Sequence, residues 1–358
     1  LAAALAMLVS IAVMIHSFRK SVQQWLDHTL LADFYLAPAV NEIAGPQAFL
    51  PDSLISTIQT NESVKLLTKF REIPIVYNNL PASLVILDGP ARGKLVLLDK
   101  EPPPASDRLK QENAALISES FAQRFQVHKG QKISLPLPNG QQLFEIAGVF
   151  RDYTRDSGTI MISLDNYVRN GGNSQAHSLA IYLKQGTNFA QFHAFLNRLA
   201  ESSLPISIYS NLQLKQRVGE IFDSTFAVTE VLRLVAIVVA ISGVLFSFGI
   251  LIRERSWEIA LLRAIGASRS QITLLVLAES AALGLAASFF GIIGGASLAL
   301  VLTYVINKAF FGWTINLLYP LPFLSTIPLW VTSLALLAAL FPAWKAAKIQ
   351  PAEALRLE

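Results

Sequence analysis

Residues 253–272 read RERSWEIALLRAIGASRSQI and carry four arginines and two glutamates between two strongly apolar stretches. Within this segment, Ile259, Leu262 and Ile265 recur at helical spacing. The pair Arg255 and Glu258 lies one helical turn apart, where opposite charges attract. These patterns predict a short amphipathic helix placed between two membrane spans.

The end of this helix and the start of the next one are also marked in the sequence. Gly266 predicts a helix stop, because glycine readily takes the left-handed conformation that ends helices. The S-x-x-Q pattern of Ser268–Gln271 is typical of a capping box, which begins a helix. The chain is therefore expected to leave the membrane, form a short helix, turn and re-enter.

The composition places the protein partly in a membrane. The chain has 358 residues, of which 53% are hydrophobic and 15% are charged, and its mean hydropathy is +0.45. Ordinary soluble domains carry more charge. The chain has no cysteine, so disulfides and cysteine-based zinc or redox sites are excluded. The net charge of +4 is too small to indicate nucleic-acid binding.

Four stretches are long and apolar enough to cross a bilayer as helices. The first lacks the basic start and the cleavage site of a signal peptide, so we interpret it as a span. The predicted spans are residues 1–18, 234–252, 272–307 and 325–344.

The charges of the short loops predict the orientation, because basic residues collect on the cytoplasmic side. The loop 253–271 carries four arginines, and the tail 345–358 carries Lys345, Lys348 and Arg356. Both segments are therefore expected in the cytoplasm. Residues 19–233 are then expected outside it, and the chain is a multi-pass protein of the inner (plasma) membrane with a large domain on its periplasmic or extracellular side.

The region 19–233 reads as a mixed α+β domain. Runs rich in Val, Ile and Leu at 71–77, 82–88 and 93–99 predict strands. The segment 131–153 predicts a hairpin around Pro138-Asn139-Gly140, in which Asn-Gly supplies the positive φ values of a tight turn. Helices are predicted at 113–125 and 189–202. The predicted fold is thus an α-helical membrane protein with four spans and one α+β extracytoplasmic domain inserted between the first and the second.

This domain shows little sign of catalytic chemistry. His128, His177 and His193 lie far apart without metal-binding spacing, which favours solvated or core histidines. No G-x-S-x-G pattern supports a serine hydrolase. GPARGKL at 89–95 lacks the spacing of a phosphate-binding loop and favours a surface turn. We predict no catalytic residue, cofactor or metal.

The motif RDYTRDSG at 151–158 packs two arginines and two aspartates beside a tyrosine. The motif is compatible with binding of a ligand head group or of a partner protein. Exposed ion pairs are common and weak, so a solvated loop whose charges compensate one another is favoured.

The charges of 253–271 have two simpler explanations, which are a helix lying in the lipid headgroups and a basic segment that only fixes topology. Neither requires the small-residue stripe Ala260, Ala264 and Ala267, which suits docking into a groove of another protein.

Three segments resemble a known family. EIALLRAIGASRSQI at 258–272 is similar to the cytoplasmic coupling segment of FtsX/MacB-type ABC transporter permeases, and FPAWKAAKIQPAEALRLE at 341–358 is similar to their closing segment. The run 115–153 resembles their extracytoplasmic domain. The order of one span, a large outer domain and three further spans is also that of the family.

The resemblance implies a permease subunit without ATPase activity of its own. A separate ABC ATPase would dock on the cytoplasmic side. Its closure would move the outer domain through two helical stalks, one after Phe18 and one before Leu234. Such transfer of movement across the membrane is called mechanotransmission. The cargo would be a lipid, lipoprotein, peptide or drug for export or extraction. The expected ATPase-coupling residues are Trp257, Glu258, Ile259, Ala260, Leu261, Leu262, Arg263, Ala264, Ile265, Gly266 and Ala267.

The resemblance also implies further partners: a second permease copy or half, membrane lipids and a periplasmic protein. The third span carries a helix-packing face at Ala287, Gly291, Gly295 and Ala299. Such a face fits packing within the chain and dimerisation equally well. The Glu279 side chain could form an ion pair near the membrane interface, or it could snorkel toward the headgroups. The second interpretation is favoured.

The chain starts directly in a span, whereas a permease of this family is expected to start with Met and a short cytoplasmic helix. We therefore expect a fragment, the C-terminal half of a longer permease with two such units. The alternative function is a membrane receptor or scaffold whose outer domain senses a ligand without energy coupling. A membrane-tethered hydrolase is disfavoured by the missing nucleophile motifs.

Overall fold

The computed structural model describes residues 2–88, 95–99, 105–201, 205–225 and 254–348, with scattered positions between 231 and 250. It divides into two compact units. The outer domain comprises residues 21–222 together with 307–314. The membrane unit comprises residues 1–20, 223–306 and 315–358.

The outer domain is built on one nine-stranded mixed sheet with the order β5-β6-β4-β7-β3-β2-β8-β1-β9. Most neighbours are antiparallel, but β4 pairs with β6 and β3 pairs with β7 in parallel. The strands are β1 (Phe34–Pro38), β2 (Val64–Tyr77), β3 (Leu80–Leu87), β4 (Ala114–Ser118), β5 (Lys132–Leu137), β6 (Gly140–Phe150), β7 (Thr159–Ser163), β8 (Ser178–Leu183) and β9 (Ile206–Ser210).

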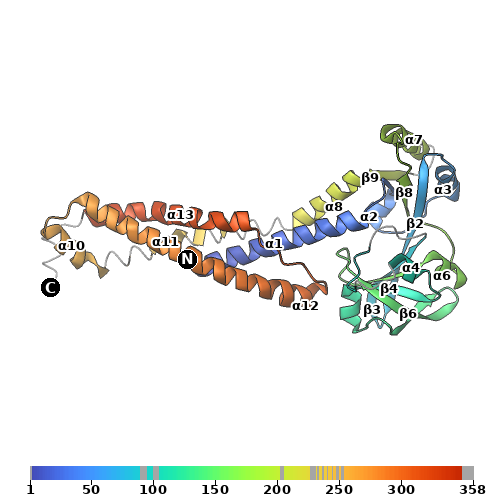
Figure 1. The fold of residues 1–358 in the computed structure, drawn as a ribbon, viewed down its shortest axis with the longest axis horizontal. Coiled ribbons are helices and arrows are strands. Elements are labelled where there is room, and N and C mark those ends of the chain that lie inside the picture. The colour runs from blue at the N-terminus through green and yellow to red at the C-terminus, as the bar shows by residue number, and fades with distance from the viewer. Residues whose placement is uncertain are drawn as a thin grey trace. The chain divides into compact units, whose positions relative to one another are not determined.

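Helices connect these strands, as Figure 1 shows. The first helix, α1 (Ala2–Thr29), starts in the membrane unit and ends in the outer domain, so it runs on past Phe18. The other helices of the outer domain are α2 (Val40–Ala44), α3 (Asp52–Gln59), α4 (Ala105–Leu109), α5 (Glu119–Phe125), α6 (Leu164–Arg169), α7 (Phe189–Glu201), α8 (Asn211–Thr225) and α12 (Asn307–Phe311).

The segment 113–125 is not one helix, in contrast to the sequence prediction. Its first part is the strand β4, whose five residues are all buried. A strand buried on both faces is a continuous apolar run without alternation, and such a run cannot be told from a helix by periodicity. The helix α5 begins only at Glu119, where the Ser118 hydroxyl caps it by accepting from the Phe121 amide.

The hairpin of 131–153 is present as β5 and β6, but its turn differs from the predicted one. Pro138 and Asn139 form the two-residue connection, since Leu137 pairs with Gly140. Only Gly140 has a positive φ there. Proline fixes φ near −65°, which excludes a turn with two positive values. A two-residue turn with two positive φ values occurs instead at Asn78 and Asn79, between β2 and β3.

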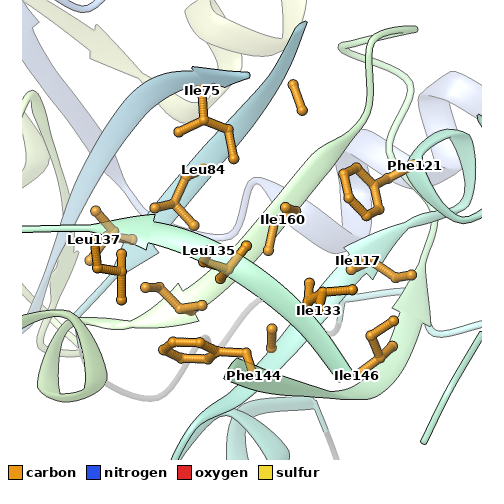
Figure 2. Packing of buried hydrophobic residues seen from close by; sticks show 14 of the residues in the cluster. Ile75, Leu84, Ile117, Phe121, Ile133, Leu135, Leu137, Phe144, Ile146 and Ile160 are labelled. Atoms are coloured by element: carbon orange, nitrogen blue, oxygen red, sulfur yellow. The ribbon is translucent and has the colours of Figure 1, made fainter. Parts of the chain in front are cut away.

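Among the described residues, the two largest buried clusters of the outer domain hold the sheet to its helices. The larger gathers residues of β2 to β7 with Phe121 of α5, and Figure 2 shows Leu84, Ile117, Leu135 and Phe144 converging on it. The second packs β1 and β8 against α3 and α7. Large aliphatic and aromatic side chains of this kind contribute about 1.5–3 kcal/mol each when fully buried.

In the membrane unit, α10 (Ser256–Ala264) precedes α11 (Arg269–Val301), the π-helical turn η1 (Leu302–Ile306) and α13 (Leu321–Ala347). Among the described residues, three helices are long and apolar enough to span a membrane, namely Ala2–Thr29, Arg269–Phe311 and Leu321–Ala347. The predicted span 234–252 lies largely outside the described residues. The architecture shown is thus three candidate membrane helices with an α+β domain between the first and the later ones.

Small residues bring these helices close together. Gly291 and Gly295 lie against Leu5 and Val9 of α1, where an added Cβ would come within 2.6 and 2.5 Å of those side chains. The α11 residue Gly284 also lies close to α13, where an added Cβ would come within 3.1 Å of the Thr332 Cα. The predicted packing face therefore contacts another helix of the same chain, and its role in assembly with a second copy stays a prediction.

Candidate coupling surface and outer-domain junction

The short helix α10 is fixed to the membrane unit by one face. Ile259 and Ala260 are buried. Ile259 packs with Ile272 of α11 and with Ala343 of α13. The buried face of α10 thus lies in one apolar cluster with residues of two membrane helices.

Polar contacts strengthen this attachment. Arg263 donates a hydrogen bond of 3.3 Å to the Ala347 carbonyl at the end of α13. Helix C-termini carry partial negative charge, so a guanidinium there is favourable. At the other end of α10, Arg255 lies 2.8 Å from Glu279 of α11 and 4.0 Å from Glu258. Glu279 is thus an ion-pair partner, and the favoured interpretation as a snorkelling side chain is wrong.

The opposite face of α10 leaves apolar side chains uncovered. Trp257, Leu261 and Ile265 follow one another every four residues and are 52%, 42% and 75% exposed. Residues four apart share one face of a helix. We call these three residues the coupling surface.

The turn after α10 has the predicted geometry. Gly266 has a φ of +107°, a conformation that costs little only for glycine. Ser268 then forms a full capping box with Gln271 at the start of α11. This box holds the exit from α10 in one conformation.

The segment 307–314, which follows η1 along the chain, belongs to the outer domain and is anchored there at Glu119. Both hydrogen-bond donors of Thr314 reach this buried carboxylate, the amide at 2.9 Å and the hydroxyl by a short bond. Gln123 donates to the Lys308 carbonyl at 2.8 Å. Gly312 approaches the Ser120 backbone so closely that an added Cβ would lie 3.0 Å from its Cα.

Tyr153 joins this segment to the end of α1. Its hydroxyl donates to the Thr314 carbonyl at 3.0 Å. Its ring makes edge contacts with both Trp25 of α1 and Trp313. Burial raises the pKa of Tyr153 to about 12, with the carboxylate of Glu119 acting in the same direction. The phenol therefore stays neutral and remains a donor. We call Trp25, Glu119, Tyr153, Trp313 and Thr314 the junction.

Comparison with known proteins identifies the chain. The model of the MacB-like periplasmic core domain matches residues 1–199, and the model of the FtsX-like permease C-terminal region matches residues 231–351. The chain belongs to the FtsX-like permeases with a MacB-like periplasmic core domain.

Relatives of this permease include an uncharacterized ABC transporter permease protein, Rv0987, of Mycobacterium tuberculosis. It is 26% identical over 99% of this chain and 42% of its own length. The lipoprotein-releasing system transmembrane protein LolC of Haemophilus influenzae is 26% identical over 68% of this chain and 64% of its own length. The macrolide export ATP-binding/permease protein MacB of Chlorobium luteolum is 37% identical over 30% of this chain and 15% of its own length. The permease thus spans less than half of its Mycobacterium relative.

The periplasmic region of MacB from Actinobacillus actinomycetemcomitans is a solved structure with similarity to the permease. It is 14% identical, with a TM-score of 0.40, and the match covers 54% of this chain and 95% of that one.

The residues expected to couple to an ATPase divide between the two faces of α10. In the small-residue stripe, Ala260 is buried and Ala267 packs against the cluster that contains Ile259, whereas Ala264 is exposed. Two of the three alanines of the stripe are therefore at least partly covered within the permease itself. The sequence did contain the signal for the exposed face, which is the spacing of Trp257, Leu261 and Ile265.

The motif at 151–158 is not a solvated, self-compensating loop as favoured from the sequence. Asp152 is buried and accepts a hydrogen bond of 2.7 Å from the Thr159 hydroxyl. Arg155 pairs with Glu72 of β2. Asp152 and Arg155 thus have fixed partners within the permease's own outer domain, whereas Asp156 is exposed.

The histidines are not brought together. His177 is buried, its ring stacks on Phe49, and its Nδ1 accepts from the Glu72 amide at 3.2 Å. Burial lowers its pKa. In the described part of the permease, no group of three or more His, Cys, Asp or Glu side chains is placed to hold a metal ion.

Proposed function

We propose that the chain is the non-catalytic permease subunit of an ABC transporter, and that a separate ATPase docks on the coupling surface. Closure of the ATPase would move α10 and, through it, the membrane helices and the outer domain. The cargo would be a lipid, lipoprotein, peptide or drug that is exported or extracted from the membrane. The names of the LolC and MacB relatives support cargo of this apolar kind.

The exposed apolar face of α10 is the observation that carries this proposal. Trp257, Leu261 and Ile265 are uncovered, although the other side of the same short helix is packed on α11 and α13. Full burial of each such side chain in a partner's groove would contribute roughly 1.5–3 kcal/mol. A helix laid into an apolar groove is a common mode of protein recognition.

Charge distribution supports the cytoplasmic side for this surface. The segment 253–271 carries Arg253, Arg255, Arg263 and Arg269, and short basic loops are retained in the cytoplasm. The outer domain would then lie on the periplasmic or extracellular side of the inner membrane. A second permease copy or half would complete the transporter.

Contacts within the outer domain support two routes for the movement. The end of α1 is tied to α8 by an ion pair of 2.8 Å between Asp27 and Lys215. Asn211 of α8 also donates to the carbonyls of Leu30 and Ala32. The junction gives a second route, through the segment that connects α11 and α13 along the chain.

The test replaces Ile265 by Asp and measures how much ABC ATPase copurifies with the full chain from its native host. An unpaired carboxylate in an apolar groove costs on the order of 3 kcal/mol or more, which is about a hundredfold in affinity. The ATPase should be lost from Ile265→Asp and retained by the control Ile43→Asp. Ile43 is also an exposed isoleucine, 93% exposed, on α2 of the outer domain.

A second measurement tests the side of the membrane. The chain has no cysteine, so Leu261→Cys gives a single thiol. A membrane-impermeant maleimide should label it only in inside-out vesicles. Labelling in right-side-out vesicles, or ATPase recovery unchanged by Ile265→Asp, would contradict the proposal and favour a receptor or a headgroup-bound helix.

A further inference from the structure

A cavity of about 280 Å³ lies in the outer domain on one face of the sheet, beside the end of α1. Its floor is made by cross-strand partners, which share a face of a sheet. Tyr35 of β1, Ala180 of β8 and Thr68 of β2 form one row of partners. Because Ala180 is small and stands between two larger residues, the row is hollow at its centre.

The walls of the cavity are apolar. Phe70 and Leu87 are paired across β2 and β3 and form one wall. Met161 of β7 and Leu30, just beyond α1, also line it. This hydrocarbon surface would bind water poorly.

The polar groups of the cavity are hydroxyls. They belong to Thr29, Tyr35, Thr68, Ser178 and Tyr182, and no charged side chain is among the residues that line it. Such a lining excludes a phosphate or carboxylate group, because a buried ion needs a charged or densely hydrogen-bonded partner. It accommodates a neutral molecule.

Two of these hydroxyls are buried without a hydrogen-bond partner among the described residues, those of Thr29 and Thr68. Thr68 is only 8% exposed. A buried hydroxyl without a partner is costly, and it marks a place where a bound group can supply the missing bond. Thr68 lies within β2 and Thr29 is the last residue of α1, so one ligand that bonds to both would contact the strand and the helix.

From these observations we propose that the outer domain binds a neutral single-chain amphiphile in this cavity. Its hydrocarbon part would lie on Phe70, Leu87 and Met161, and an ester, amide or hydroxyl group would bond to Thr68 and Thr29. The volume is about twice that of an engineered cavity that holds benzene, which corresponds to roughly a dozen non-hydrogen atoms. The cavity is partly open, so it would hold the polar group and part of the chain, and the rest of a long chain would extend out of it. A free monoacyl lipid and an acyl chain on a peptide share this chemistry. The proposal rests on the outer domain alone and is independent of the ATPase.

The test uses the full chain in phosphatidylcholine nanodiscs with a monoacylglycerol that carries a diazirine in its chain. After irradiation, crosslinked residues are mapped by mass spectrometry. Saturable labelling is expected in 29–35, 68–70 and 178–182. Labelling of α11 and α13 by the surrounding lipid phase provides an internal reference in the same sample.

Variants then separate the cavity from general lipid contact. Ala180→Phe fills the hollow and should reduce labelling of the cavity peptides at least tenfold, with the α13 signal unchanged. Thr68→Val keeps the shape and removes one hydroxyl, so a several-fold loss is expected from one hydrogen bond. Thr57→Val, at an exposed position of α3, is the matched control and should change nothing.

Competition identifies the source of the ligand. Unlabelled monoacylglycerol or a palmitoylated neutral peptide should each displace the probe, and the one that acts at lower concentration is the better ligand. If wild-type labelling of the cavity peptides is absent or does not saturate, the proposal is overturned. The proposal is also overturned if the cavity peptides of Ala180→Phe and of Thr68→Val are both labelled to the same extent as those of the wild type. Because competition is measured on the wild type, the conclusion does not depend on a variant that folds poorly.

Discussion

Replacement of Glu119 by Ala should release the segment 307–314 from the outer domain. The buried carboxylate accepts hydrogen bonds from both the amide and the hydroxyl of Thr314. Hydrogen bonds to a charged group contribute about 1.5–3 kcal/mol each. Allowing for water that enters the space left by the side chain, we expect the free energy of opening this segment to fall by about 3 kcal/mol, or roughly a hundredfold in the opening equilibrium.

Hydrogen exchange of the full chain in nanodiscs measures this opening. The Gly312 amide is the best reporter, because it bonds to the Lys308 carbonyl at 3.0 Å and not to Glu119 itself. Its exchange should accelerate roughly a hundredfold in Glu119→Ala. Glu119→Gln should give a smaller acceleration, since an amide retains one neutral acceptor and one donor for Thr314.

The matched control is Glu201→Ala, at the exposed end of α7, and it should exchange like the wild type. If Gly312 exchanges within twofold of the wild type in Glu119→Ala, the carboxylate does not hold the segment. The second route for movement in the proposed function would then lose its support.

Two further predictions concern stability. Asp99→Asn should destabilise the outer domain by about 2–3 kcal/mol at pH 7, because it leaves the buried guanidinium of Arg108, 2.8 Å away, without its carboxylate partner. Although burial acts to raise the pKa of Asp99, hydrogen bonds from Lys129 and Arg108 outweigh it and lower that pKa below 3.8. The contribution is therefore present above pH 3.8 and lost as the pH falls through the folded-state pKa, so urea titrations of wild type and variant should converge in acid and not at neutral pH. In the membrane unit, Gly295→Ala should lower the thermal midpoint, because its Cβ would lie 2.5 Å from that of Val9, and overpacking costs about 1–3 kcal/mol. Gly294→Ala gains the same helix propensity but meets Ala6 at an ordinary 3.5 Å, so equal midpoints for the two variants would contradict this packing.

The sequence alone determined the elements whose signal is local. Span-length apolar runs predicted the three candidate membrane helices found among the described residues. The start of α11 followed from Ser268 and Gln271, which form the capping box within four residues of chain. Helix α7 and the strand pair β5 and β6 were likewise predictable, because their apolar residues follow a regular period.

Only the tertiary structure decided which faces are used and which distant residues meet. The strand β4 was mistaken for a helix because burial on both faces erases the period. The face of α10 that stays exposed depends on α11 and α13, which cover Ile259 and leave Ile265 exposed. The contact of Glu119 with Thr314 joins residues 195 positions apart. No local pattern encodes such a contact, because it exists only once the segment 307–314 has packed on the outer domain.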